Sequence, residues 1–130
     1  MPRREIISTP QAPAAIGPYN QAVKVGETLY CSGQIPIVPD TGELLRGDIE
    51  EQATQVLDNL GAVLEAAGYD YTDVVRCTIY LADMKDYAAV NEVYARYFKD
   101  NHPARETIAV ACLPREADVE ISCIAVKESA

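Results

Sequence analysis

The sequence predicts an α+β fold, with one mixed sheet of roughly six strands and two helices packed on one face of the sheet. Apolar residues recur at helical spacing in two segments and alternate with polar residues in several shorter ones. These segments follow one another as strands, helix, strand, helix and two strands. Because strand crossovers are right-handed, both helices should cover the same face. The 130 residues suit one domain, so we expect a single domain over residues 1–130.

The chain is acidic, with 20 Asp and Glu residues against 11 Lys and Arg residues and a net charge of −9. Nucleic-acid binding depends on neutralising phosphates with basic side chains, so this balance argues against a nucleic-acid partner. It also disfavours an anionic membrane surface. Arg3 and Arg4 are followed by no continuous apolar segment, so we expect neither a signal peptide nor a membrane span. The expected compartment is the cytoplasm.

The chain has four cysteines and one histidine. The cysteines are widely spaced, none forms a C-x-x-C pair, and each shares the parity of its apolar neighbours in a strand-like segment. We therefore expect all four to be buried and reduced: Cys31, Cys77, Cys112 and Cys123. The lone His102 cannot form a histidine cluster, so we expect neither a metal site nor Ser-His-Asp catalysis.

Three short strands are predicted in the first part of the chain, over residues 5–8, 22–25 and 28–33. Prolines between the first two keep that connection extended and irregular. Gly26 and Glu27 separate the second and third strands and predict a hairpin turn.

The first helix is predicted over residues 48–67. Its apolar positions recur at helical spacing: Ile49, Ala53, Val56, Leu57, Leu60, Val63, Leu64 and Ala67. Asp48 and Glu51 have the spacing of a capping box, and Gly68 is a natural stop.

Residues 72–81 alternate as a strand, and a second helix is predicted from Asp83 or Asp86 to about Phe98. In the strand, Val75, Cys77, Ile79 and Leu81 share one face, and Val74, Arg76, Thr78 and Tyr80 share the other. The predicted buried stripe of the helix is Tyr87, Val90, Tyr94, Tyr97 and Phe98, with Asn91 near its edge.

Two strands joined by residues 113–116 are predicted in the segment 102–126. In the first, Arg105, Thr107, Ala109 and Ala111 alternate with Ile108, Val110 and Cys112. In the second, Glu120, Ser122, Ile124 and Val126 alternate with Val119, Ile121, Cys123 and Ala125. Arg105 and Glu120 therefore lie on the less apolar parity of their strands, and we expect both on the face that no helix covers.

That uncovered face should still carry apolar side chains. The expected set is Tyr30, Val74, Tyr80, Ala109, Ala111, Ile124 and Val126. An exposed apolar patch of this kind marks an interface, so we expect a symmetric homo-oligomer with Arg105 and Glu120 near a subunit boundary.

Five side chains have chemistry suited to a small-molecule site. Arg105 is either a surface arginine or a bidentate anchor for a small carboxylate. Glu120 is either a solvated strand residue or a carboxylate that holds and polarises a water. Tyr19, in a loop with Gly17 and Pro18, either packs or closes over a planar ligand. Ser32 and Thr107 could each supply one hydrogen bond.

The run PARETIAVACLPREADVEI resembles the characteristic motif of the RidA family of YjgF-type reactive-intermediate deaminases. IGPYNQAV, LYCSGQIPI, DIEEQATQVLDNLGAVLEAAG, DVVRCTIYLADMKDY and VNEVYARYF resemble further family segments in the same order. The resemblance implies a chorismate-mutase-like α+β fold and a homotrimer with three clefts between subunits. It implies hydrolysis of 2-iminobutanoate and 2-iminopropanoate, or their enamine tautomers, to 2-keto acids and ammonia, without a cofactor.

The same resemblance assigns roles to individual residues. The carboxylate-binding arginine corresponds to Arg105, the water-positioning glutamate to Glu120 and the mobile tyrosine to Tyr19, so these three are the expected catalytic residues. Besides Arg105, the expected substrate-binding residues are Ser32, Gly33, Asn91 and Thr107, with Gln34 completing the Ser-Gly-Gln motif. Two residues depart from the family pattern: Glu106 replaces a small residue, and Ser122 replaces a second acidic one. By parity, Glu106 should point away from Arg105.

Two other functions compete with this reading. Removal of Met1 would expose Pro2, the catalytic base of tautomerases, although the rest of the chain does not support that class. A non-enzymatic trimeric module that binds 2-keto acids or similar small carboxylates is the stronger alternative, because Arg105 serves both functions and only the enzyme requires Glu120. An endoribonuclease fits poorly with the negative charge and the single histidine.

Overall fold

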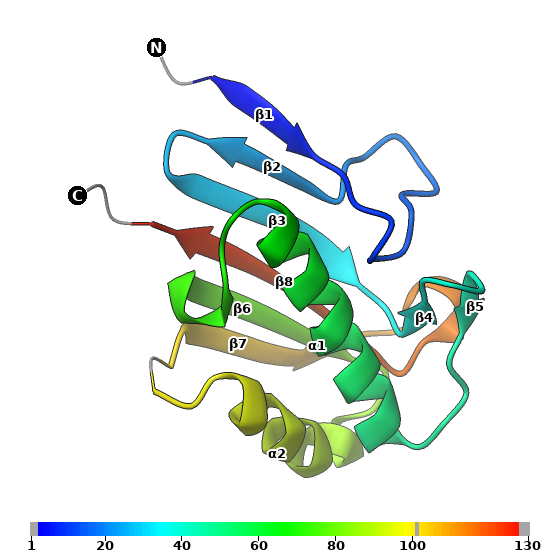
Figure 1. Cartoon of the computed structure of the whole chain (residues 1–130). Coiled ribbons are helices and arrows are strands. Elements are labelled where there is room, and N and C mark those ends of the chain that lie inside the picture. The colour runs from blue at the N-terminus through cyan, green and yellow to red at the C-terminus, as the bar shows by residue number, and fades with distance from the viewer. Residues whose placement is uncertain (1–2, 101, 128–130) are drawn as a thin grey trace.

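The computed structural model describes residues 3–100 and 102–127, so Pro2 lies outside the described residues. One six-stranded sheet has the strand order β1-β2-β3-β8-β6-β7, and the only parallel neighbours within it are β6 and β7 (Figure 1). Its strands are β1 (Arg4–Ile7), β2 (Ala22–Val25), β3 (Thr28–Gln34), β6 (Val74–Leu81), β7 (Ala104–Ala109) and β8 (Val119–Val126). β4 (Ile37–Val38) and β5 (Glu43–Leu44) form a separate pair. The predicted α+β class and mixed sheet are confirmed.

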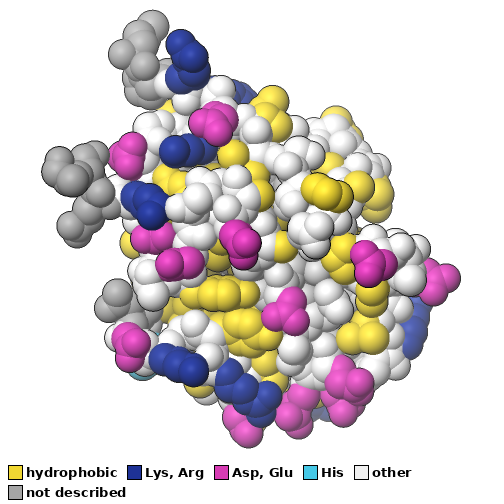
Figure 2. Space-filling model, viewed as in Figure 1, with side chains coloured by type: hydrophobic (Ala, Val, Ile, Leu, Met, Phe, Trp, Pro, Cys, Tyr) yellow, Lys and Arg dark blue, Asp and Glu magenta, His cyan; other side chains and the backbone are white. Residues whose placement is uncertain are grey.

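Two α-helices, α1 (Ile49–Ala66) and α2 (Tyr87–Tyr97), cover the same face of the sheet (Figure 1). Single 3₁₀ turns occur at Tyr71–Asp73, Met84–Asp86 and Pro114–Glu116. Neither described α-helix is long and apolar enough to cross a membrane. On the helix-bearing side, acidic side chains are spread over the surface with apolar patches between them (Figure 2).

The ends of α1 follow the sequence prediction. The Asp48 carboxylate accepts a hydrogen bond from the Glu51 backbone N–H at 2.8 Å, and the Glu51 carboxylate accepts one from the Asp48 N–H at 3.1 Å. This capping box satisfies two N–H groups that have no partner within the helix. Gly68 follows the helix with φ at +81°, a conformation that glycine adopts without a steric cost.

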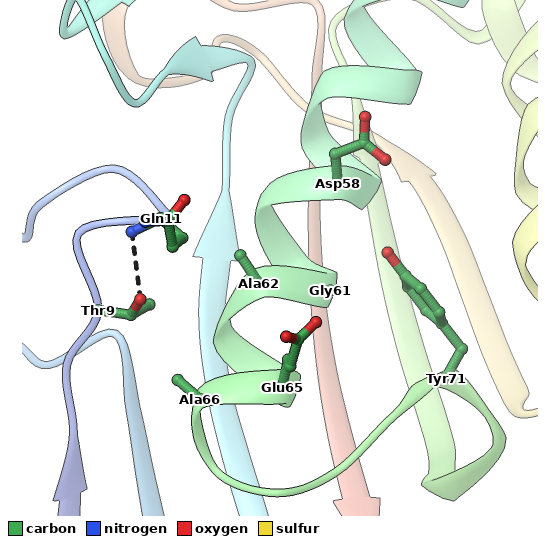
Figure 3. Close-up of a pocket in the computed structure, with 8 residues that line it drawn as sticks. All are labelled: Thr9, Gln11, Asp58, Gly61, Ala62, Glu65, Ala66 and Tyr71. Atoms are coloured by element: carbon green, nitrogen blue, oxygen red, sulfur yellow. Dashed lines mark hydrogen bonds between the residues drawn. The ribbon is translucent and has the colours of Figure 1, made fainter.

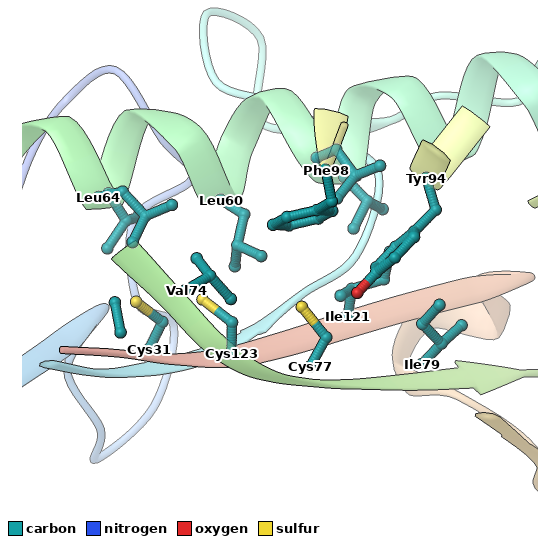
Figure 4. Packing of buried hydrophobic residues seen from close by; sticks show 14 of the residues in the cluster. Cys31, Leu60, Leu64, Val74, Cys77, Ile79, Tyr94, Phe98, Ile121 and Cys123 are labelled. Carbon is teal, nitrogen blue, oxygen red and sulfur yellow. The ribbon is translucent and has the colours of Figure 1, made fainter. Parts of the chain in front are cut away.

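The hydrophobic core lies between the two helices and the sheet. Leu60 and Leu64 of α1 and Phe98 after α2 meet Ile79 and Ile121 from the strands (Figure 4). Three of the four cysteines are buried there as predicted: Cys31, Cys77 and Cys123. They are register partners across β3, β8 and β6. The prediction was wrong for Cys112, which is exposed because β7 ends at Ala109 and residue 112 belongs to the following loop.

An irregularity at the start of β6 reverses the predicted orientations of Val74 and Val75. Val74 is 3% exposed and Val75 is 47% exposed, whereas the alternation predicted Val75 in the core and Val74 outside. The register with β8 shifts between Val74 and Arg76, as in a β-bulge, and this shift turns the first residue inward. From Cys77 to Leu81 the predicted alternation is confirmed.

The buried face of α2 also differs from the prediction. Val90, Tyr94 and Phe98 are buried as expected, but Val93 is fully buried and was missed. Tyr87 was expected in the core and is 40% exposed, because it lies over the edge strand β7, where its hydroxyl contacts Arg105.

Neither described α-helix covers the second face of the sheet, and several large apolar side chains are exposed there. The register places Tyr30 beside Ile124, and Ile108 beside Tyr80. Tyr30 is 51% exposed and Ile108 is 45% exposed. Of the residues predicted for this face, Val74 is buried and Ala109 pairs with the core residue Leu81, so those two assignments were wrong.

Replacing the cap of α1 should destabilise the fold. Asp48→Ala removes the acceptor for the Glu51 N–H and should lower the free energy of unfolding by about 1 kcal/mol in urea denaturation. Asp48→Asn keeps a side-chain oxygen and should recover most of that loss. Equal losses in both variants would contradict the assigned role of the cap.

Candidate active site

Four of the predicted site residues line one cavity of about 340 Å³ at the end of β3. Tyr19, Ser32, Gly33 and Glu120 all contribute to its wall. Gln34 also lines it, with apolar surface from Ile16, Ile35, Ile37 and Pro114. A carboxylate and small polar groups within an apolar wall are typical of small-molecule sites.

Glu120 projects from β8 on the uncovered face, beside Tyr80 of β6. Its side chain is half-buried, and this burial raises the pKa of its carboxyl group above the ordinary value. Gly33 makes room for it, since a Cβ on Gly33 would lie 2.2 Å from Glu120 Oε2. A side chain at position 33 would therefore displace this carboxylate from its place against β3.

The backbone around Gly33 is irregular because the pairing of β3 with β8 shifts between Cys31 and Gln34. In this interval the Ser32 backbone N–H donates to the Gln21 carbonyl at 2.9 Å. The Ser32 hydroxyl donates to the Asn20 carbonyl at 2.5 Å. Ser32 thus holds the loop that carries Tyr19, whose side chain is 49% exposed at the cavity wall.

Arg105 lies in a different environment, against the first turns of α2. Its Nη1 donates to Asn91 Oδ1 at 2.6 Å, and its Nη2 donates to the Tyr87 hydroxyl at 2.9 Å. The guanidinium carbon lies 4.9 Å from the centre of the Tyr94 ring. The same carbon lies 5.7 Å from the centre of the Tyr87 ring. Two directed hydrogen bonds and two aromatic rings therefore set the orientation of this cation.

Thr107 lies two residues beyond Arg105 on the same side of β7. Its hydroxyl oxygen is buried and has no hydrogen-bond partner among the described residues. A second cavity of about 300 Å³ borders Arg105 and Asn91, together with Tyr94 and His102.

The structure contradicts the prediction that Arg105 and Glu120 share the uncovered face. Arg105 is the register partner of Cys77, which points into the core, whereas Glu120 is the partner of Tyr80. Positions 77 and 80 of one strand face opposite sides, so the two charged residues lie on opposite faces of the sheet. Their two cavities share no lining residue. The predicted residues therefore form two separate half-sites within one chain.

The reason for this error is that β7 is an edge strand. Its more apolar parity was assigned to the core, yet Ile108 is on the uncovered face and is 45% exposed. Arg105 and Thr107 take the helix side, where α2 provides polar partners. The prediction that Glu106 points away from Arg105 is confirmed, and its carboxylate forms an ion pair with Arg76 on the uncovered face.

Tyr87 and Tyr94 are site residues that the sequence reasoning missed. Both were assigned to the buried stripe of α2, although their contacts with Arg105 bring them to this half-site. The available signal was their spacing from Asn91, since positions i, i+4 and i+7 share one face of a helix.

Three further cavities in the described residues are lined by none of the predicted site residues. No group of three or more His, Cys, Asp or Glu among them could hold a metal ion. A cavity of about 560 Å³ beside α1 contains Asp58, Glu65 and Tyr71, but none of the predicted site residues (Figure 3). There the Tyr71 hydroxyl donates to the Leu57 carbonyl, and Asp58 accepts from Tyr97.

Comparison with known proteins places the chain in a family. The family model described as Endoribonuclease L-PSP matches residues 9–127. A mouse protein named 2-iminobutanoate/2-iminopropanoate deaminase is 52% identical over 95% of this chain and 92% of its own length. A RutC family protein of Pyrococcus horikoshii is 53% identical over 96% of this chain and 99% of its own.

Two solved structures give the same result. A Rid family protein of Yersinia pestis has a TM-score of 0.94 and 48% identity, covering 96% of this chain and 100% of that one. The structure of TdcF from E. coli with bound serine has a TM-score of 0.92 and 41% identity, covering 95% and 99%. The chain therefore belongs to the Endoribonuclease L-PSP family, the YjgF or RidA family that its sequence motifs resemble.

Proposed function

We propose that this protein hydrolyses small 2-imino acids, such as 2-iminobutanoate and 2-iminopropanoate, or their enamine tautomers, to 2-keto acids and ammonia. The observation that carries the proposal is the guanidinium of Arg105, held by Asn91 and Tyr87. The names of relatives such as the mouse deaminase support the same substrates.

Arg105 is suited to bind the carboxylate of such a substrate. A guanidinium has five N–H groups, and two donate to protein acceptors in the described residues, which leaves three for a ligand. A planar carboxylate can accept two parallel N–H bonds from this group. Asn91 and the buried Thr107 hydroxyl lie beside it and would contact the rest of the substrate.

Glu120 would then act on water. Its carboxylate accepts a proton as the water oxygen bonds to the imine carbon, and the C=N electron pair moves to nitrogen. Glu120 returns this proton to the nitrogen, which gives the neutral carbinolamine. The carboxylate then takes the hydroxyl proton and passes it to the nitrogen, the C–N bond breaks to release ammonia, and the oxygen electron pair forms the C=O bond of the keto acid. Positioning alone can lower such a barrier by roughly 7 kcal/mol or more, so this chain's residues suffice without a cofactor.

We infer a homotrimer, because one chain keeps the two half-sites apart. Cyclic assembly that packs the β7 edge of one subunit against the uncovered face of the next would bring Arg105 of one subunit to Glu120 of its neighbour and form three clefts. The exposed Tyr30 and Ile108 on that face support an interface there.

A trimeric module that only binds 2-keto acids remains the second candidate, favoured by the same Arg105 geometry. Glu120 separates the two functions, because binding a carboxylate gains nothing from a second, partly buried carboxylate nearby. The raised pKa of Glu120 suits proton transfer better than anion binding.

Arg105→Ala should remove the carboxylate anchor. We expect kcat/KM for 2-iminobutanoate to fall about 100-fold, measured as 2-oxobutanoate release above the uncatalysed rate from an imine generated in situ. Arg105→Lys keeps the charge without the planar fork and should recover only part of this loss. A variant Arg105→Ala as fast as the wild type would rule out the anchor.

Glu120→Gln should preserve binding of 2-oxobutanoate while lowering turnover on the order of 100-fold. Because burial raises the pKa of Glu120 and its carboxylate form is the active one, kcat/KM should decrease as the pH falls through this raised pKa. The acid limb should therefore lie above the usual range of a glutamate. Unchanged turnover in Glu120→Gln would rule out the role assigned to Glu120. A wild type that binds 2-oxobutanoate but hydrolyses no imine would favour the binding module.

Subunit mixing tests the shared cleft. Arg105→Ala and Glu120→Ala trimers should each be nearly inactive, yet every mixed trimer would contain one intact cleft. Random exchange of equal amounts should therefore restore about a quarter of wild-type activity. Complete exchange, shown by native mass spectrometry, without any recovery would place both residues in a site of one chain.

A further inference from the structure

Tyr87 is the first residue of α2 and lies at the open end of the Arg105 half-site. Tyr87, Asn91 and Tyr94 follow one another at i, i+4 and i+7, so they form one line along the helix. All three contact the guanidinium of Arg105: two through hydrogen bonds and the third through its ring. The helix thus presents a continuous polar and aromatic seat for one side chain.

We propose that Tyr87 is a positioning residue that fixes the plane of the Arg105 guanidinium and makes the anchor selective for planar carboxylates over tetrahedral anions. This inference rests on the proposed function of Arg105 as the carboxylate anchor. It assigns to Tyr87 a role beyond packing.

The contacts restrain the guanidinium at both of its terminal nitrogens. Asn91 accepts from Nη1 at 2.6 Å and Tyr87 accepts from Nη2 at 2.9 Å. The Tyr94 ring, 4.9 Å from the guanidinium carbon, supports one face. With only Asn91 and Tyr94 present, the guanidinium could still swing about the Cδ–Nε bond and carry Nη2 out of its place. The Tyr87 hydroxyl supplies a second fixed point and restrains that rotation.

The Tyr87 side chain is not a core residue of the fold. Its side chain is 40% exposed, whereas Tyr94 is 6% exposed. The exposed Tyr87 hydroxyl accepts a hydrogen bond from Arg105, whereas the buried Tyr94 hydroxyl has no hydrogen-bond partner in the described residues. Tyr94 therefore contributes its ring. Tyr87 contributes a directed oxygen atom at the surface, besides a more distant ring at 5.7 Å that Tyr87→Phe would keep.

A fixed guanidinium plane matters because a carboxylate is planar and accepts two coplanar N–H bonds. A sulfonate is tetrahedral and has three oxygens, so it can follow a guanidinium that rotates. Loss of the Tyr87 hydroxyl should therefore weaken carboxylate binding more than sulfonate binding. A general loss of structure would weaken both equally.

The test compares wild type with Tyr87→Phe, which removes only the hydroxyl. Inhibition constants are measured for propanoate and ethanesulfonate, which share an ethyl group and a single negative charge, with 2-iminobutanoate as substrate. We expect the constant for propanoate to rise about threefold to tenfold, because the lost bond is charge-assisted but partly exposed. The constant for ethanesulfonate should change less than twofold, and KM should rise while kcat stays close to the wild-type value.

Tyr97→Phe is the matched control. It removes a tyrosine hydroxyl from the same helix, but that hydroxyl donates to Asp58 of α1, away from Arg105. The ratio of the two inhibition constants should stay at the wild-type value in this variant. Thermal unfolding of both variants shows whether each remains folded at the assay temperature.

Suppose that the wild type binds propanoate more tightly than ethanesulfonate and that Arg105→Ala no longer binds propanoate. An unchanged ratio of the two inhibition constants in Tyr87→Phe would then overturn the role of Tyr87 but not the proposed function. A wild type that binds both anions equally well would also overturn the role of Tyr87 alone. If the wild type hydrolyses no imine and binds neither propanoate nor 2-oxobutanoate, the proposed function fails together with this inference.

Discussion

The central position of β8 is the constraint on which the rest of the structure depends. β8 pairs antiparallel with both β3 and β6, and Cys123 lies between Cys31 and Cys77 in register. This pairing decides which alternate residues of β3, β8 and β6 face the helices. Because the buried side is densely packed, a shift of one residue would expose the whole core set. The same constraint directs Glu120 to the face that no helix covers.

The parallel pairing of β7 with β6 then separates the two charged residues. Arg105 takes the same side as Cys77, where α2 provides Asn91 and two tyrosines. Glu120 takes the other side, against Gly33. Fixed alternation across one sheet thus keeps Arg105 and Glu120 apart within a single chain, and the proposed trimer would bring them together.

The surroundings of Arg105 and Glu120 act on these two side chains in different ways. Arg105 is oriented by three neighbouring side chains, so its contribution is directional. Glu120 is partly removed from water, which raises the pKa of its carboxyl group and would make its carboxylate a stronger base in the proposed reaction. The Glu120 carboxylate lies close to the backbone of β3 at Gly33, and a side chain at position 33 would displace it.

Local patterns in the sequence determined the α+β class, both helices, the capping box at Asp48 and the opposite directions of Arg105 and Glu106, because periodicity and caps depend on residues close together in the chain. Only the tertiary structure decided that Val74 turns inward, that Arg105 faces α2 and that Tyr87 joins the site. Alternation shows which residues share a face of a strand. Which face meets the helices depends on bulges and on the register with neighbouring strands, and these are set by contacts between residues far apart in sequence.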